Sequence, residues 1–386
     1  MRRGRAVVAM LAMVVAAGGL VSCDGGPGSS GPPLDPNIKR EWLFWRGDAA
    51  QTGCAPGSLP QALKPLWRFK AGGAIISTAV VAGGRVYVAS LDHKVYALDL
   101  ASGQLVWATD LEAGTDSAPL LADGTLYIGD YDGFFYALDA ADGRLKWKFE
   151  TGDKIIGAAA WVPVAGGHLV VFGSYDFNLY ALDPATGKEV WTYESDNYVN
   201  GSPAVVGGKV IFGGCDSLVR VLDGATGRET SAVDIGSYVA ASPAVVGTNV
   251  YIGHMEGAFA AVDLATRKVL WEYSGDDAFF SSAAVGESLV VVGCRDTLVH
   301  AINRASGEQA WTFETGDEVD SSPVIVGDKV LVGSGDGALY LLRLADGRKL
   351  WSYDLGGAVA ASPAVAGDLV IIGSTDGHVH AFCPKP

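Results

Sequence analysis

The chain has 386 residues, of which 49% are hydrophobic and 18% charged, a balance that excludes a disordered chain and predicts a large buried core. Its 52 glycines, together with many Val, Ile, Tyr and Trp residues, are typical of short strands joined by tight turns. The formal net charge of −15 argues against nucleic acid as a partner, because an acidic surface repels phosphates.

The first 22 residues have the layout of an export signal. Three arginines within the first five residues precede an apolar run over residues 6–17, which is too short to span a bilayer. The following Leu20-Val21-Ser22-Cys23 matches a bacterial lipobox, which predicts that the Cys23 thiol is acylated and becomes the mature N-terminus. A plain cleaved signal with an incidental Cys is the alternative. An acylated Cys23 would anchor the protein to a lipid bilayer on the extracytoplasmic side, with the inner and outer membranes both open.

Residues 23–40 are rich in Gly, Pro and Ser and have no apolar periodicity. Such a composition behaves as a flexible coil, so this stretch is expected to be a tether that lets the folded body stand off the membrane. The folded domain is expected over residues 41–386.

A Trp residue marks a repeat of about forty residues. The marked positions are Trp67, Trp107, Trp147, Trp191, Trp271, Trp311 and Trp351. The one longer step, of 44 residues, follows Trp147, and position 231 holds Ser in an otherwise matching unit. A fixed period near forty made of short alternating segments predicts a β-propeller.

One unit illustrates the expected blade. Alternating apolar residues predict four antiparallel strands at 75–81, 85–90, 95–99 and 104–109, separated by Gly- and Asp-containing turns. Counting from residue 75, the chain contains eight such units. The fold class is therefore all-β, an eight-bladed propeller of four-stranded antiparallel blades.

The two ends of the chain predict how the ring closes. The last unit stops after its third strand, at residues 378–383, whereas a solitary strand at Lys64–Lys70, containing Trp67, precedes the first unit. Completing the last blade with this strand leaves no open sheet edge. Cys54 and Cys383 lie near that closure and could form a disulfide in an oxidising compartment, although two free thiols are equally compatible. Cys215 and Cys294 are expected to be free.

Each Trp is expected to be stacked between neighbouring blades, where an indole buries on the order of 200 Å². The loss of this contact at Ser231 predicts a weak point in blade 4.

Positions that vary between the units indicate where function is located. One ring stands nine residues after each Trp position and comprises Ile76, Asp116, Ile156, Asn200, Ala240, Phe280, Asp320 and Ala360. A second ring, two residues earlier, comprises Ala74, Gly114, Lys154, Tyr198, Tyr238, Ala278, Glu318 and Ala358. Both rings are expected at the mouth of the central channel. The candidate partner or ligand surface consists of Asp116, Lys154, Trp161, Tyr198, Asn200, Tyr238, Phe280, Glu318 and Asp320, because aromatic residues dominate protein interfaces.

No catalytic or metal-binding residue is assigned. The sequence contains no Ser-His-Asp order, phosphate loop or zinc spacing that stands out. Asp116, Asn200 and Asp320 could meet a cation, but blades 2, 4 and 7 lie far apart. His378 and His380 are spaced to share a ligand, but His380 occupies a packing position that holds Tyr in other units.

The repeat resembles the tryptophan-docking motif of propellers of the pyrroloquinoline quinone (PQQ) type. The pattern Ala97-x-Asp99-x-x-x-Gly103-x-x-x-Trp107 recurs at residues 137–147 and 181–191, and with Asn for Asp at 301–311. Residues 41–70, which begin Glu-Trp-Leu-Phe-Trp, resemble the segment that commonly opens these proteins. The resemblance covers about residues 41–383 and implies that each Trp lies in an outer strand and packs against the next blade.

The two main branches of this superfamily imply different functions. PQQ-dependent dehydrogenases carry a vicinal Cys-Cys pair, a Ca²⁺ site and long insertions, none of which is visible in this sequence. The lipoprotein branch similar to BamB, the outer-membrane protein assembly factor, agrees in size, lipobox and blade number. It implies a monomeric, non-catalytic envelope scaffold without a cofactor that binds other envelope proteins. The alternatives are a quinoprotein-like enzyme or ligand binder that uses PQQ or Ca²⁺ at the channel mouth, and a carbohydrate- or cell-wall-binding protein.

Overall fold

The structure is a computed structural model that describes residues 38–385. The predicted signal peptide, the acylation site Cys23 and the tether up to residue 37 lie outside the described residues. Among residues 38–385 the secondary structure consists of strands and turns without a helix. Accordingly, that part of the chain offers no helix of the length and apolarity that a bilayer crossing requires.

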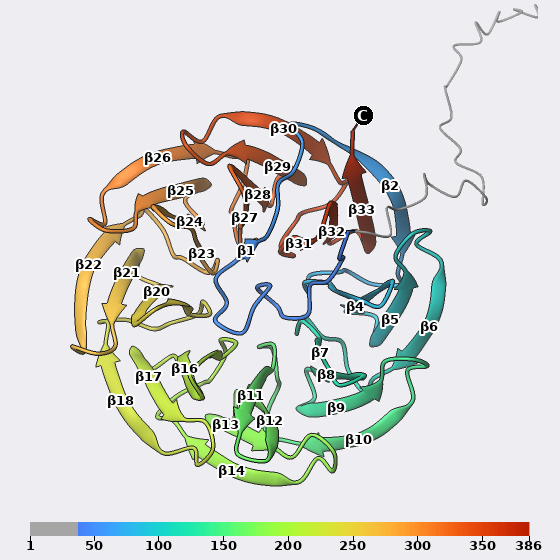
Figure 1. Ribbon diagram of the computed structural model, residues 1–386, viewed down its shortest axis with the longest axis vertical. Helices are drawn as coiled ribbons and strands as arrows, with labels where there is room; N and C mark the ends of the chain where they lie inside the picture. The colour runs from blue at the N-terminus through green and yellow to red at the C-terminus, as the bar shows by residue number, and fades with distance from the viewer. Residues whose placement is uncertain (1–37, 386) are drawn as a thin grey trace, which may run out of the picture.

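Eight sheets stand around a central channel like the blades of a propeller, as predicted (Figure 1). The innermost strands of blades 1–8 are β3 (Val80–Ala82), β7 (Leu120–Ala122), β11 (Ala160–Val164), β15 (Ala204–Val206), β19 (Ala244–Val246), β23 (Ala284–Val285), β27 (Val324–Val326) and β31 (Ala364–Ala366). The second strands are β4 (Arg85–Ser90), β8 (Thr125–Gly129), β12 (Gly167–Gly173), β16 (Lys209–Gly213), β20 (Asn249–Gly253), β24 (Leu289–Gly293), β28 (Lys329–Gly333) and β32 (Leu369–Gly373).

The outer half of each blade is equally regular. The third strands are β5 (Lys94–Asp99), β9 (Phe134–Asp139), β13 (Asn178–Leu182), β17 (Leu218–Asp223), β21 (Ala258–Asp263), β25 (Leu298–Asn303), β29 (Ala338–Arg343) and β33 (His378–Pro384). The outermost strands are β6 (Leu105–Asp110), β10 (Leu145–Glu150), β14 (Glu189–Glu194), β18 (Glu229–Asp234), β22 (Lys268–Ser274), β26 (Gln309–Glu314), β30 (Lys349–Asp354) and, in blade 8, β2 (Leu63–Lys70).

The predicted ring closure is confirmed. β2 pairs antiparallel with β33, and Trp67 lies opposite Ala381. The N-terminal strand therefore supplies the outer strand that blade 8 lacks, and the edge of β33 is paired.

The innermost strands are shorter than the sequence predicted. In blade 1 the ladder covers residues 80–82 instead of 75–81. The Ser77 hydroxyl donates to the Ala89 carbonyl at 3.0 Å and accepts from the Ala89 N–H at 3.2 Å. Near the channel, the Ser77 side chain therefore replaces backbone hydrogen bonds that a longer inner strand would form with β4.

The indoles join neighbouring blades, as expected. Six of the seven repeat Trp residues donate their Nε1–H to a backbone carbonyl of the next blade at 2.8–3.2 Å, namely Trp67, Trp107, Trp147, Trp191, Trp271 and Trp311. A glycine of that next blade lies against each of the same six rings. At Gly103, for example, a Cβ atom would come within 2.6 Å of the Trp67 ring, and φ is +69°. The Gly of the repeat is therefore required by both the turn and the indole.

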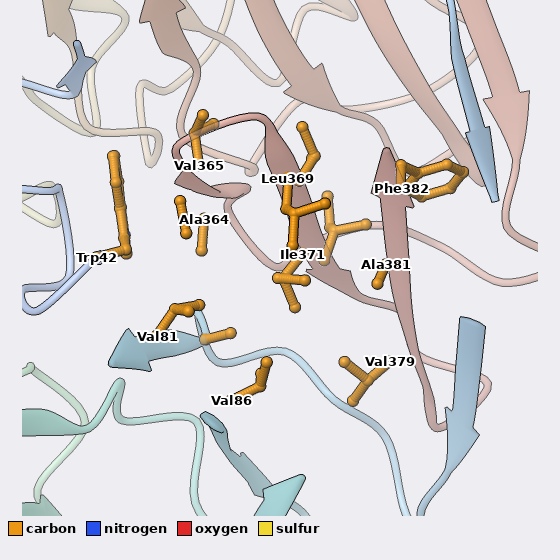
Figure 2. Packing of buried hydrophobic residues seen from close by; sticks show 14 of the residues in the cluster. Trp42, Val81, Val86, Ala364, Val365, Leu369, Ile371, Val379, Ala381 and Phe382 are labelled. Atoms are coloured by element: carbon orange, nitrogen blue, oxygen red, sulfur yellow. The ribbon is translucent and has the colours of Figure 1, made fainter. Parts of the chain in front are cut away.

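Residues 41–55, here called the plug, lie across one end of the channel. Trp42 forms a backbone bridge to Val81 of β3, and Figure 2 shows its ring beside Ala364 and Val365 of β31. The plug ends in β1 (Cys54–Ala55), which adds a fifth, parallel strand to blade 7 next to β27. Neither the plug's position nor β1 was predicted from the sequence. Just before the plug, Arg40 pairs with Asp368 at 2.8 Å.

The possible disulfide between Cys54 and Cys383 is not formed. Cys54 lies at the channel edge of blade 7, paired with Ile325, whereas Cys383 lies in the third strand of blade 8, opposite Lys64. Both cysteines are close in sequence to the strands that close the ring, but β1 turns inward to blade 7, so the two cysteines lie in different blades. Cys215 and Cys294 are free thiols, as expected.

Candidate binding face at the channel mouth

The channel holds a cavity of about 160 Å³. All eight residues of the first variable ring, from Ile76 to Ala360, line it. Trp45 of the plug also lines it, and its indole N–H lies 3.5 Å from the Ser242 hydroxyl. The cavity is therefore a cup with the plug as its floor.

Backbone hydrogen bonds fix the plug in place. The N–H groups of Val205, Val245, Val285 and Ile325, at equivalent positions of blades 4–7, donate to plug carbonyls at 2.6–2.9 Å. The Arg46 side chain is fully buried and donates to the carbonyls of Ser322, Ala283 and Pro323. Burial lowers the pKa of Arg46 to about 10, which leaves the guanidinium charged at neutral pH.

Serine hydroxyls connect the blades below the mouth. The Ser242 N–H donates to Ser282 Oγ and the Ser282 N–H donates to Ser322 Oγ, each at 2.9 Å and each across one blade boundary. The same bond links Ala158 to Ser202, Ser202 to Ser242 and Ser322 to Ser362. The cup wall is thus a hydrogen-bonded belt over blades 3–8.

At the open end, a backbone hydrogen bond pairs the second variable ring with a third one. In every blade an acidic residue, here called the turn acid, stands in the turn between the second and third strands. The turn acids are Asp92, Asp132, Asp176, Asp216, Glu256, Asp296, Asp336 and Asp376. Within each blade, the residue just before the turn acid donates its N–H to the carbonyl of a residue of the second ring. These pairs are Leu91–Ala74, Tyr131–Gly114, Tyr175–Lys154, Cys215–Tyr198, Met255–Tyr238, Arg295–Ala278, Gly335–Glu318 and Thr375–Ala358. The turn acids brace this layer: Asp176, for example, accepts from the N–H of Gly152 at 2.7 Å.

Aromatic side chains gather on blades 2–5 of this mouth face. The aromatic arc, as we call it, consists of Tyr131, Tyr175, Phe177, Tyr198 and Tyr238. Tyr198 lies 4.8 Å from Tyr175 and 5.2 Å from Phe177, measured between ring centroids. Tyr198 is 39% exposed and Tyr238 56% exposed. The arc therefore presents a large apolar surface to solvent on one side of the mouth.

Polar residues of the cup support the arc from below. Tyr131 lies close enough to Asp116, and Asn200 close enough to Tyr175, for each neighbour to influence the pKa of the other residue. Burial raises the pKa of Asp116 to about 6, against the opposing effects of Tyr131 and of the positive charge of Lys154. The Lys154 ammonium lies 4.3 Å from the Tyr175 ring centre, a cation–π contact. One oxygen each of Asp116 and Asn200 is buried without a donor among residues 38–385.

The opposite side of the mouth is organised around Arg295. Its guanidinium binds both carboxylate oxygens of Asp320, at 2.9 and 2.8 Å, and approaches Glu318 at 3.4 Å. It also lies 3.8 Å from the Phe280 ring centre. Three of the sequence-predicted residues are therefore held together by an arginine that the sequence analysis did not select.

Trp161 does not join the other eight candidates. It lies in β11 at the position equivalent to Val205, stacks on His168 at 4.8 Å, and borders the plug beside Phe44 and Ala49. Its place is at the plug end of the channel, opposite the mouth. The residues that the sequence analysis missed at the mouth are Tyr131, Tyr175, Phe177, Met255 and Arg295. The third variable ring, one residue before each turn acid, was the signal that could have identified four of them.

One cluster in blade 6 has the residue types of a metal site. Ligand atoms of Cys294, Asp296 and His300 lie within 4.8 Å of one another. Each atom already has a protein partner, however: His300 bonds Asp296 and Tyr273, and the Cys294 thiol donates to the Asp277 carbonyl. Burial raises the pKa of Cys294 to about 12, which keeps it protonated. His300 takes the place of the tyrosines that bond the turn acid in other blades.

The His378–His380 pair is also explained by packing. His378 bonds Asp376 at 2.7 Å, whereas burial lowers the pKa of His380 to about 4 and keeps it neutral. His380 stacks on Phe382 at the slot that the sequence analysis assigned to packing.

Comparison with known proteins identifies the family. A family model described as outer membrane protein assembly factor BamB matches residues 64–158, 155–283 and 275–385. The chain belongs to the BamB family.

Solved structures similar to this BamB-family chain share its fold. The crystal structure of BamB from Moraxella catarrhalis is 21% identical, has a TM-score of 0.73, and is matched over 83% of this chain and 100% of its own. Quinohemoprotein alcohol dehydrogenase from Comamonas testosteroni is 16% identical, with a TM-score of 0.77 over 91% of this chain and 82% of its own.

A sequence relative matches only a short part of the chain. A polyvinylalcohol dehydrogenase of a Pseudomonas species is 30% identical over 93 residues, which are 22% of this chain and 14% of that enzyme.

Because the similar structures include a quinohemoprotein dehydrogenase, the chemistry of the cup bears on whether PQQ could bind there. PQQ is a planar tricyclic molecule with three carboxylates, so its site needs cationic side chains and room for the rings. The residues lining the cup include no Lys or Arg, and they include two carboxylates, Asp116 and Asp320. The volume of about 160 Å³ is below the ~300 Å³ at which ligand pockets ordinarily begin. The residues that line the cup therefore do not match what PQQ requires.

Proposed function

We propose that this protein is a non-catalytic scaffold of the bacterial cell envelope that binds partner proteins through its mouth face and acts in the assembly of outer-membrane proteins. The observation that carries the proposal is the aromatic arc, whose rings stand on four adjacent blades and in which Tyr198 contacts Tyr175 and Phe177. Large apolar patches on a monomer surface mark interaction sites, and Tyr is enriched among the residues that carry binding energy.

The structure beneath the arc supports a preorganised binding surface. The loops that carry the rings are hydrogen-bonded within each blade, and the serine belt and the turn acids hold them from below. A surface that is ordered before binding loses little conformational entropy when a partner docks. Tyr198 and Tyr238 are the anchors that we expect to contribute most, since they are the most exposed rings of the arc on the second variable ring.

The proposed location follows from the N-terminal sequence and the family. An acylated Cys23 would hold the propeller at a membrane, with the Gly/Pro/Ser tether as spacer. The family description names outer-membrane protein assembly, and other envelope proteins are the partners that such a role requires. The poor fit of the cup to PQQ, together with Asp320 being ion-paired to Arg295, favours this role over that of a quinone-dependent enzyme.

A membrane pull-down tests the proposal. Full-length protein is crosslinked in membranes of the source bacterium and captured, and co-purified proteins are identified. Replacing Tyr198→Ala together with Tyr238→Ala should lower recovery of the specific partner about tenfold or more, as expected for two interface anchors. The matched control, Leu105→Ala with Leu145→Ala, removes similarly exposed apolar side chains from the outer strands and should leave recovery unchanged.

Two outcomes would contradict the scaffold role. One is equal partner recovery with wild-type protein and the Tyr198→Ala/Tyr238→Ala variant. The other is alcohol or sugar oxidation, followed with an electron-accepting dye, by purified protein supplied with PQQ and Ca²⁺.

A further inference from the structure

The boundary between blades 4 and 5 lacks the indole that joins most other blades. At six of the other seven boundaries, the outer strand of one blade inserts a Trp against the following blade, where a carbonyl accepts the indole N–H and a Gly makes room for the ring. In blade 4 the residue at this position is Ser231, opposite Val221 in the neighbouring strand.

The receiving side of the same boundary has also changed. The Gly that would face the indole is replaced by Arg267, which keeps the left-handed backbone of the glycines it replaces, with φ of +58°. At the equivalent Gly227, a Cβ atom would come within 2.6 Å of the Trp191 ring. A side chain at position 267 is therefore compatible with Ser231 but not with a Trp there. The two departures from the repeat belong to a single change.

A cavity remains where the indole would lie. The seam pocket, as we call it, has a volume of about 290 Å³ and is lined by Ile211, Val221, Ser231, Val245 and Leu264, among others. Ile211 lies 20 residues before Ser231, as Tyr87, Tyr127 and Tyr251 lie before the Trp residues that they contact at 5.8–6.0 Å. Ile211 therefore stands at the wall position that contacts the indole in those blades.

The hydrogen-bond acceptor of an indole site is present as well. The Leu264 carbonyl stands at the position of the Gly224, Arg304 and Leu344 carbonyls, which accept the N–H of Trp191, Trp271 and Trp311. Among residues 38–385 no donor bonds to it. The Arg267 side chain is exposed and donates to the Thr230 carbonyl at 3.3 Å, so it lies at the rim and does not fill the pocket.

We propose that the seam pocket is a binding site for a tryptophan side chain of a partner polypeptide. Its apolar walls would cover the ring, and the Leu264 carbonyl would accept the indole N–H, as in the intact boundaries. Lys209, which lines the pocket, and Arg267 at its rim make the entrance basic, which favours a Trp flanked by acidic residues.

This site is separate from the mouth face. Two residues that line the pocket lie next to residues that hold the plug. Val206 follows Val205 and Gly247 stands two residues after Val245, and the N–H groups of Val205 and Val245 donate to plug carbonyls. The pocket is therefore at the plug end of the propeller, opposite Tyr198 and Tyr238. The inference rests on the repeat alone and does not depend on the function proposed for the mouth.

Binding of indole probes to the full-length protein tests the first step. Fluorine NMR with the amide of N-acetyl-5-fluorotryptophan should show saturable binding with a Kd on the order of 0.1–1 mM, as expected for a ligand of this size. The 1-methyl derivative, which lacks the N–H, should bind at least tenfold more weakly. Absence of saturable binding, or equal binding of the methylated probe, would overturn the proposal.

A variant that fills the pocket locates the site. Ser231→Trp combined with Arg267→Gly restores the residues of an intact boundary, and it should weaken probe binding at least tenfold without unfolding the protein. Ser231→Ala leaves the pocket open and should bind like the wild type. Unchanged binding by the filled variant would place the probe elsewhere and refute the site.

A peptide comparison tests the polypeptide source. A pentapeptide with one central Trp between acidic residues should bind at least as tightly as the single amino-acid probe, and its Leu-substituted counterpart should not bind. If the amino-acid probe bound but the Trp peptide did not, the pocket would be a site for small indoles, and the partner assignment would be wrong.

Discussion

The boundary between blades 3 and 4 and the one between blades 4 and 5 are built from the same repeat but are held together differently. In the first, Trp191 packs against Gly227 and donates to the Gly224 carbonyl at 3.1 Å. In the second, Ser231 and Arg267 occupy the positions of the Trp and the Gly, and the buried cluster at the boundary consists of aliphatic residues. The comparison teaches that Trp and Gly are retained as a pair: once the indole is lost, the glycine is no longer required. It also teaches that a closed ring tolerates one boundary without an indole, since both of its neighbours are still fixed elsewhere.

The largest expected effect comes from making the intact boundary resemble the open one. Replacing Trp191→Ser removes a buried indole and its hydrogen bond, so the free energy of unfolding should fall by ~3–5 kcal/mol. Urea denaturation followed by circular dichroism measures it. Ser231→Ala is the control and should change stability by less than about 0.5 kcal/mol. A Trp191→Ser variant as stable as that control would mean that the indoles do not hold the ring together.

A second comparison separates the two demands on the repeat glycine. Gly227 has φ of +69° and a Trp ring 2.6 Å from any added Cβ, whereas Gly207 has φ of +58° and open space around it. Gly207→Ala should therefore cost only the backbone strain, ~1 kcal/mol. Gly227→Ala should cost ~2–3 kcal/mol, because the indole must also shift. Equal losses in thermal or urea unfolding would show that the ring contact is unimportant.

Much of the ring was predictable because its signals are side chains at a fixed spacing. The Trp period gave the blade number, and the isolated strand at Lys64–Lys70 gave the closure. Ser231 was recognised as a departure from the repeat. Its link to Arg267 was not, because the motif was read within single units and the contact joins consecutive ones.

What the sequence did not reveal depends largely on backbone bonds or on side chains that carry no period. The plug is held by inner-strand N–H groups and by Arg46, and neither leaves a pattern in the sequence. Eight of the nine candidate residues belong to the first two variable rings, and in the structure they lie at the mouth end of the channel. Tyr131, Tyr175 and Arg295 were missed because the ring before the turn acids was not compared across the units. Trp161 was selected as an aromatic residue, but its position in β11 puts it at the plug end.

The pocket-filling variant should also change stability, by less than the losses above. Ser231→Trp with Arg267→Gly should raise the free energy of unfolding by ~1–2 kcal/mol, since a cavity is filled and an acceptor is satisfied, while Val221 limits the fit. Ser231→Trp alone should gain less or destabilise, because the Arg267 Cβ would meet the ring. A double-mutant cycle measures the difference. Additive single effects would contradict the pairing of the two positions.

The smallest effect is expected in local opening of the wild-type protein. Peptides covering β18 (Glu229–Asp234) should exchange amide hydrogens several-fold faster than those covering β14 (Glu189–Glu194), because no indole holds β18 against the next blade. Mass spectrometry of exchange under native conditions measures both strands in one experiment. The filled variant should slow exchange in β18 and leave β14 unchanged, so each strand serves as the other's control. If β18 exchanged no faster than β14 in the wild type, the aliphatic cluster at the open boundary would hold the strand as firmly as Trp191 holds its own.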